Sequence, residues 1–151
     1  MSYHVAILRT EGGRAIPITK EEVLKLAAAF PAWRYDEDQD ALVSLEGAEA
    51  PALWFSDGEL WTKNPSRETL EAMLQFAKYI RGRVRGDELE TYRTPTESYL
   101  HPDDATAKAE SDAYGQALVR RMRIKQWTFN ALLLGGFVAV ILFLKRMGFL
   151  E

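Results

Sequence analysis

The stretch ALWFSDGELWTK, residues 52–63, decides the fold. Asp57 and Gly58 stand between two apolar runs, and these residue types accept the positive φ angles that a type I′ hairpin turn requires. A two-residue turn places Trp54 directly opposite Trp61, with the neighbouring apolar residues on the other face of the hairpin. The sequence therefore predicts an antiparallel hairpin with the tryptophan pair on one face. Two alternatives stay equally open for that face: it is exposed opposite the core, or a helix covers it.

Before this hairpin, the sequence predicts one strand, one helix and two short strands. Residues 2–9 (SYHVAILR) are rich in aliphatic and aromatic side chains and end before a glycine pair, as a strand does. Thr19 and Glu22 have the spacing of a capping box, so a helix begins there. Residues 33–35 and 42–45 are predicted as short strands that flank an acidic turn.

After the hairpin, apolar residues recur at helical spacing between residues 70 and 80. Asn64 and Pro65 are predicted as the N-cap and the first residue of this second helix. A turn at residues 86–87 predicts a further short strand or hairpin, and residues 94–102 are predicted as an irregular connection. We therefore expect an α+β fold in which a small, mostly antiparallel sheet carries two amphipathic helices on one face.

The C-terminal part of the chain predicts a membrane span. Residues 126–144 (QWTFNALLLGGFVAVILFL) contain no charged residue, and a helix of this length covers about 28 Å, near the hydrocarbon thickness of a bilayer. The purely apolar part, 131–144, is short enough for a buried core helix, which is the alternative. The flanks favour the membrane, because cationic side chains reach the headgroups and tryptophan prefers the interface. These anchoring and orienting residues are Arg120, Arg121, Arg123, Lys125, Trp127, Lys145 and Arg146.

The expected fold is thus an α+β head followed by a long C-terminal helix that includes a single transmembrane span. Its parts are a cytoplasmic α+β domain (1–100), a juxtamembrane helix or linker (101–125), a transmembrane helix (126–146) and a short tail (147–151). Four basic residues precede the span and two follow it, so the positive-inside rule places the head in the cytoplasm. The chain is therefore predicted to be a single-pass, tail-anchored protein of the inner membrane.

Charge and composition limit the classes of partner that the chain is expected to bind. Residues 1–100 carry 12 Lys and Arg against 17 Asp and Glu, a net charge of −5, whereas residues 101–151 carry 7 against 5. An acidic head disfavours nucleic acid, which needs a cationic surface, and suits a basic protein partner beside the lipid bilayer. Ala131, Gly135 and Ala139 would let two spans pack as a homodimer, although chance placement in a span rich in alanine and glycine explains them equally.

No sequence pattern predicts a cofactor, a metal or a catalytic residue. The chain has no cysteine and two histidines, His4 and His101, which lack the spacing of a zinc motif. The acidic run 36–40 begins like a calcium loop, but its sixth position is alanine and its twelfth is glycine, so a solvated turn is the better interpretation. The candidate partner-binding residues are Trp54, Trp61, Asp36, Glu37, Asp38 and Asp40.

The segments DGELWTKNPS (57–66) and GRVRGDELETYRTPTE (82–97), followed by a helix and an apolar stretch, resemble small bacterial tail-anchored membrane proteins of uncharacterised function. The resemblance covers the head and its anchor, and it implies a bacterial inner membrane but no activity and no functional residue. In general build, a compact acidic α+β head, the chain is also similar to immunity proteins that neutralise secreted toxins.

These observations favour a non-catalytic, membrane-tethered protein-interaction domain, with toxin neutralisation as one specific form. Two alternatives stay open, namely an enzyme at the membrane surface that uses carboxylate chemistry and an accessory subunit of a membrane complex. A closed cleft that gathers Asp87, Glu88 or Glu90 with a buried His4 would favour the enzyme. A flat face that displays the tryptophan pair would favour binding.

Overall fold

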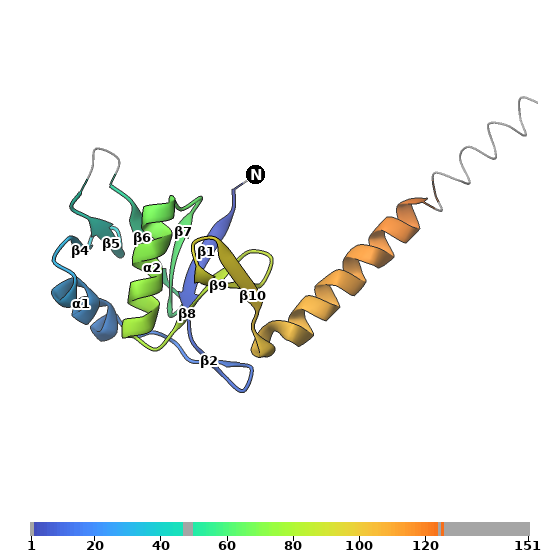
Figure 1. Ribbon diagram of the computed structural model, residues 1–151, viewed down its shortest axis with the longest axis horizontal. Helices are drawn as coiled ribbons and strands as arrows, with labels where there is room; N and C mark the ends of the chain where they lie inside the picture. Colours follow the sequence, from blue (N-terminus) through green and yellow to red (C-terminus); the bar gives the residue numbers. More distant parts are fainter. Residues whose placement is uncertain (1, 47–49, 124, 126–151) are drawn as a thin grey trace, which may run out of the picture. The chain divides into compact units, whose positions relative to one another are not determined.

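The structure, a computed structural model, describes residues 2–46, 50–123 and 125. The chain divides into two compact units, Met1–Lys108 and Ala109–Glu151. The first unit contains the strands and the helices α1 and α2 (Figure 1). Residues 105–123 are helical and cross the boundary between the two units.

An antiparallel sheet of eight strands organises the first unit, in the order β10-β9-β8-β1-β7-β6-β5-β4 (Figure 1). Its strands are β1 (His4–Leu8), β4 (Trp33–Asp36), β5 (Ala41–Ser44), β6 (Ala52–Ser56), β7 (Glu59–Lys63), β8 (Arg83–Gly86), β9 (Glu90–Thr94) and β10 (Glu97–Leu100). The first strand therefore lies inside the sheet, between the meander from β4 to β7 and the meander from β8 to β10. A separate small hairpin pairs β2 (Thr10–Glu11) with β3 (Arg14–Ala15).

The predicted hairpin is confirmed in its turn and its register. Asp57 and Gly58 have φ angles of 54° and 76°, as a type I′ turn requires. Trp54 pairs with Trp61 across β6 and β7. Because successive residues of a strand point to opposite faces, this register fixes which side chains of the hairpin enter the core.

The first helix, α1 (Lys20–Ala29), begins at the predicted capping box. The Glu22 N–H donates to Thr19 Oγ1 at 3.3 Å, and the Thr19 N–H donates to Glu22 Oε2 at 2.9 Å. Each residue thus satisfies a backbone donor that the first turn of a helix would otherwise leave unpaired.

The second helix, α2 (Arg67–Tyr79), begins two residues later than the Asn64 prediction, with Ser66 as its N-cap. The Asn64 prediction is wrong because Asn64 bonds to the start of the chain instead. Its N–H donates to the Tyr3 carbonyl at 2.8 Å, and its Oδ1 accepts the Tyr3 N–H at 2.9 Å. Ser66 takes over the cap, since its hydroxyl accepts the N–H of Thr69 at 3.2 Å.

Both helices pack on the same face of the sheet, which we call the core face (Figure 1). Apolar side chains from both helices join side chains that alternate along the central strands, as the period of two in a strand dictates. Members of this buried cluster are Val5, Ile7, Val23, Leu26, Leu42, Leu53, Leu60, Met73, Phe76 and Val84.

The sheet is larger than the small sheet that the sequence predicts. Residues 97–100 form the edge strand β10, although they were expected within an irregular connection. All four side chains of β10 are exposed, so the strand carries no alternation of apolar and polar residues that would reveal it. A 3₁₀ turn, η1 (Pro102–Asp104), follows it and leads into the helix at residue 105.

The predicted transmembrane fold is contradicted. In the described ranges, no helix is both long enough and apolar enough to cross a membrane. The stretch on which the prediction placed the span, 126–146, lies outside the described residues. The predictions of a tail anchor, of a bilayer partner and of an inner-membrane location depend on that span and lose their structural support with it.

Candidate partner-binding face

The tryptophan pair lies on the sheet face opposite α1 and α2, which we call the open face. Trp61 is paired with Trp54 on one side and with Ala6 on the other, and Ala6 is paired in turn with Arg85. Residues directly opposite one another in neighbouring strands share a face. The next residues along the same strands, such as Leu60, are buried beneath the helices, so the row through Trp61 points away from them.

The two indole rings form a close cross-strand contact. Their centroids lie 5.0 Å apart with an interplanar angle of 34°, and the Trp61 Nε1–H donates to Ser56 Oγ at 3.0 Å. Lys63 lies beside the pair, with Nζ 5.8 Å from the Trp61 ring. Both tryptophans are partly exposed, so they form a rigid aromatic surface that a partner can reach.

His4, on β1, lies next to Trp61 and adds a third ring to the row of Trp54 and Trp61. On its other side, His4 contacts the Asp87 carboxylate. The imidazole lies 5.8 Å from the Trp61 ring, and its Nδ1 is 3.3 Å from Asp87 Oδ2. The same carboxylate oxygen accepts the His4 backbone N–H at 2.7 Å. These groups, with Glu59 and Arg85, line a shallow cavity of about 270 Å³, which gives the open face a hollow beside its aromatic row.

The His4 imidazole also approaches Ser2, with Nε2 3.3 Å from the hydroxyl oxygen. The side chains of Ser2, His4 and Asp87 therefore contact one another in that order, as the catalytic residues of serine hydrolases do. However, the side chains of His4 and Asp87 are 42% and 45% exposed, and activation of a serine relies on a site that excludes water. We interpret this chain of contacts as a surface hydrogen-bond network.

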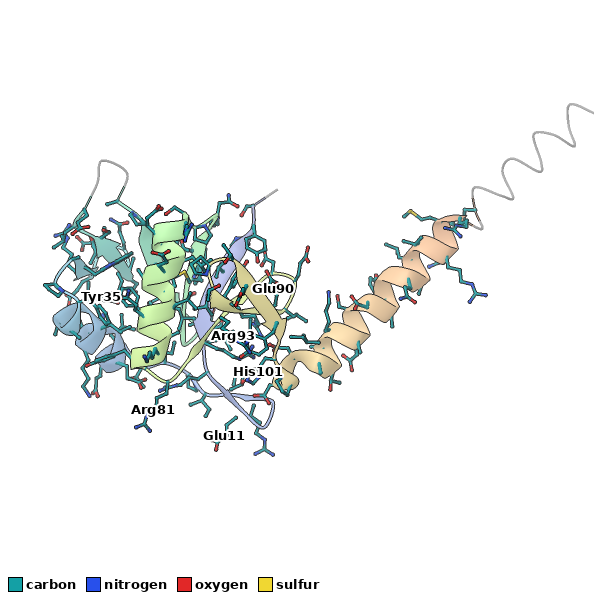
Figure 2. The ribbon with its side chains drawn as sticks, viewed as in Figure 1. Glu11, Tyr35, Arg81, Glu90, Arg93 and His101 are labelled. Carbon is teal, nitrogen blue, oxygen red and sulfur yellow. The ribbon has the colours of Figure 1, made fainter. Side chains whose placement is uncertain are left out.

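Of the carboxylates named for the enzyme alternative, Asp87 contacts His4, but the His4 side chain is 42% exposed rather than buried, and Glu90 lies elsewhere. Glu90 lies on the core face, where its Oε1 accepts a hydrogen bond from the Tyr92 hydroxyl at 3.3 Å. The Tyr92 hydroxyl also lies 2.7 Å from the Tyr3 hydroxyl. Burial, and then the charge of Glu90, raise the pKa of Tyr92. Figure 2 shows Glu90 and Tyr35 on opposite sides of α2. The closed cleft with a buried His4 that would indicate an enzyme is therefore not what these residues form.

At the β8 end of the open face, Asp104 binds two arginines. Its Oδ1 lies 2.9 Å from Arg83 Nη2 and 3.3 Å from Arg85 Nη1, and its Oδ2 contacts Arg83 Nη1. Burial raises the pKa of Asp104, but the hydrogen bonds and charges of the two arginines together lower it by more, so the carboxyl is ionised. This ion pair holds the segment after β10 against the sheet.

In the acidic turn, residues 36–40, some carboxylates form hydrogen bonds within the chain and others are exposed to solvent. Asp36 Oδ1 accepts the N–H groups of Asp38 and Gln39 at 3.0 and 3.2 Å. Asp40 accepts the Tyr35 hydroxyl and lies 3.6 Å from Lys20 Nζ. Glu37 and the Asp38 side chain are exposed. In the described ranges, no group of three or more His, Asp and Glu side chains is arranged to hold a metal ion.

The remaining predicted residues belong to the second unit. Arg120, Arg121, Arg123 and Lys125 are exposed and helical. The predicted helix-pairing and flanking residues Trp127, Ala131, Gly135, Ala139, Lys145 and Arg146 lie outside the described residues. The structure therefore brings together Trp54 and Trp61 among the predicted binding residues. It places beside them His4 and Asp87, which the sequence analysis named for the enzyme alternative and not for the binding face. His4 and Asp87 are 83 positions apart, and their place beside the tryptophan pair follows from the pairing of β1 with β7 and β8, which no local pattern in the sequence signals.

No protein-family model, no curated protein and no solved structure matches this chain.

Proposed function

We propose that this chain is a non-catalytic protein-binding domain that takes a basic protein partner on its open face. The observation that carries the proposal is the row Trp54, Trp61 and His4, whose rings are in contact and partly exposed on a face that neither helix covers. Tryptophan anchors near the centre of an interface commonly supply a large share of the binding energy. A surface that is already rigid also loses little side-chain entropy when a partner docks.

Charge supports a basic partner. Residues 1–100 have a net charge of −5, and Glu37, Asp38 and Asp87 present exposed carboxylates on the turns around the sheet. Opposite charges on two proteins raise the rate of association and bias the orientation in which they meet. Toxin neutralisation is one specific form of this function, because an inhibitor needs only a complementary surface and no chemistry of its own.

The test compares partners captured by the full-length chain and by Trp61→Ala. We expect a specific basic protein that the unaltered chain retains and the variant loses, with retention falling as salt rises. Tyr114→Ala is the matched control, since Tyr114 is 73% exposed on the helix of residues 105–123. Trp61→Phe keeps a ring in the sheet and separates loss of binding from loss of folding.

Binding of the captured protein would then be measured with purified components. We expect Trp61→Ala to weaken it by about tenfold or more, as removal of a central aromatic anchor does. Equal affinity for the unaltered chain and Trp61→Ala would contradict binding through the open face. Capture of the same proteins by both would contradict it as well.

A further inference from the structure

The large sheet ends at β4, and one edge of this strand is open. β4 pairs with β5 on one side and, in the part of the chain that the structure describes, with no strand on the other (Figure 1). An open strand edge presents backbone N–H and C=O groups to which another strand can pair. The residues of β4 therefore decide which strand this edge accepts.

The hydrogen bonds between β4 and β5 show which backbone groups face the open edge. The Leu45 N–H donates to the Ala32 carbonyl at 2.8 Å, at the end of the register that pairs β4 with β5. Along an antiparallel pair, every second residue bonds to the partner strand. The backbone groups of Arg34 and Asp36 therefore face β5, and those of Tyr35 face the open edge. Tyr35 thus offers one donor and one acceptor to a strand that docks there.

The charges beside Tyr35 are complementary to themselves. Arg34 and Asp36 lie on the open face of the sheet, with Arg34 Nη2 3.9 Å from Asp36 Oδ2, and the Arg34 side chain is 64% exposed. When the β4 strands of two copies pair antiparallel about Tyr35, each Arg34 stands opposite Asp36 of the other copy. These positions are non-hydrogen-bonded pairs, in which side chains come closest. Opposite charges there stabilise a sheet, and like charges destabilise it.

Tyr35 supplies an aromatic contact on the core face. It pairs with Leu42, which is fully buried, and it lies at the β4 end of the sheet (Figure 2). In the same register the two Tyr35 rings stand directly opposite each other, as a cross-strand aromatic pair. Lys20 and Asp40 lie beside the ring, but they pair with each other at 3.6 Å. They therefore add no net charge at this junction.

The opposite end of the sheet lacks this complementarity. All four residues of β10 are exposed, and Glu97 is the only charged residue among them. Within β10, a second copy therefore presents no positive charge to Glu97. The pattern of alternating opposite charges favours β4 as the edge that recognises itself.

We propose that the open edge of β4 binds β4 of a second copy of this chain and joins the two sheets into one continuous antiparallel sheet. Such a contact is symmetric, since each copy contributes the same residues. The open faces of the two copies then lie on the same side, because Asp36 shares a face with Ala41 and Trp54. A partner with two contact surfaces could engage both copies and bind with higher avidity.

The first test is sedimentation velocity of the full-length chain from about 1 µM to about 1 mM. We expect a monomer–dimer equilibrium. Arg34→Glu should raise the dissociation constant at least about tenfold, because a carboxylate at position 34 would face Asp36 of the second copy. Arg14→Glu makes the same change of charge at an exposed position of β3, and it should leave the equilibrium unchanged.

Amide hydrogen exchange, followed by NMR at the two ends of this concentration range, locates the contact. Exchange of the Tyr35 amide should slow as the dimer forms, whereas the Arg34 amide, which faces β5, should exchange equally at both concentrations. Equal dissociation constants for the two variants would overturn the inference. Exchange at Tyr35 that does not depend on concentration would overturn it as well. Partner capture through Trp61 is measured separately, so the proposed function can stand if this inference fails.

Discussion

Asp104 and Arg83 form a two-point ion pair that fastens the end of the first unit to its sheet. The Arg83 and Asp104 side chains are 10% and 6% exposed, and Arg83 Nη1 also donates to Thr91 Oγ1 at 2.8 Å. Removing one partner of a buried pair leaves the other charged group uncompensated. The ion pair therefore holds the chain after β10 in place, and its loss should lower the stability of the fold more than the loss of a surface ion pair would.

Asp104→Asn should lower the free energy of unfolding by about 3 kcal/mol or more. Urea denaturation, followed by tryptophan fluorescence, measures this change. Asp38→Asn is the matched control, because the Asp38 side chain is exposed at the β4–β5 turn, and it should stay within about 0.5 kcal/mol of the unaltered chain. Similar losses for both variants would contradict a special role for Asp104.

The same ion pair predicts a pH dependence. The Arg83 and Arg85 groups outweigh the effect of burial and lower the pKa of Asp104 in the folded chain. A carboxyl whose pKa is lower when folded stabilises the fold above its unfolded value, about 4. That contribution is lost as the pH falls through the lower folded value. Urea midpoints measured from neutral pH down to about 3 should therefore fall less steeply for Asp104→Asn than for the unaltered chain.

Local signals in the sequence predicted the local structure. The Asp57–Gly58 turn, the capping box of Thr19 and Glu22 and the register of the tryptophan pair each depend on residues a few positions apart, and all three are present. Contacts between distant residues overruled local preference elsewhere. Asn64 has the side chain of a helix cap but bonds to Tyr3, 61 positions away, and nothing near Asn64 signals this.

The candidate site was predictable only in part, for the same reason. Trp54 and Trp61 belong to one hairpin, whereas the His4–Asp87 contact requires the pairing of β1 with β8. The apolar stretch 126–144 was the strongest single pattern, and the membrane fold built on it is contradicted in the described ranges.

Gly86→Ala should destabilise the first unit by about 1–3 kcal/mol. A Cβ atom at Gly86 would overlap the Tyr3 hydroxyl and the Glu90 carboxylate, so both side chains would have to leave the positions in which they contact the Tyr92 hydroxyl. Gly115→Ala is the same substitution where nothing lies within 4 Å of the added atom. It should instead increase helix content, since alanine favours a helix by up to about 1 kcal/mol over glycine.

Circular dichroism and urea denaturation of the two glycine variants distinguish these effects. The urea midpoint should fall for Gly86→Ala and stay constant for Gly115→Ala. An unchanged midpoint for Gly86→Ala would show that Tyr3 and Glu90 can move aside without loss of stability.

Trp54 and Trp61 should stabilise the hairpin as a pair. A double-mutant cycle with Trp54→Ala and Trp61→Ala should give a coupling energy of about 0.5–1.5 kcal/mol, as stacked aromatic pairs do. Additive effects would indicate that the 5.0 Å contact contributes no interaction beyond the burial of each ring. The cycle also sets the stability loss against which the binding defect of Trp61→Ala is judged.

Arg9→Lys should destabilise the first unit although it keeps the charge. Arg9 Nη1 and Nη2 donate to the two Glu22 oxygens at 2.7 and 2.9 Å, and also to the carbonyls of Ile80 and Pro17 at 3.2 and 3.0 Å. The guanidinium thus ties the first turn of α1 to the residue after α2. Lysine cannot reproduce this planar set of donors, so we expect a loss of about 1–3 kcal/mol by urea denaturation.

Arg67→Lys is the control for this substitution. Arg67 pairs with Glu71 at 3.2 Å on the surface of α2, where the two side chains are 70% and 49% exposed. Exposed pairs of this kind contribute little, so its effect should stay within about 0.5 kcal/mol. If Arg9→Lys were equally mild, the charge of residue 9 alone, rather than its planar hydrogen bonds, would hold the two helix ends together.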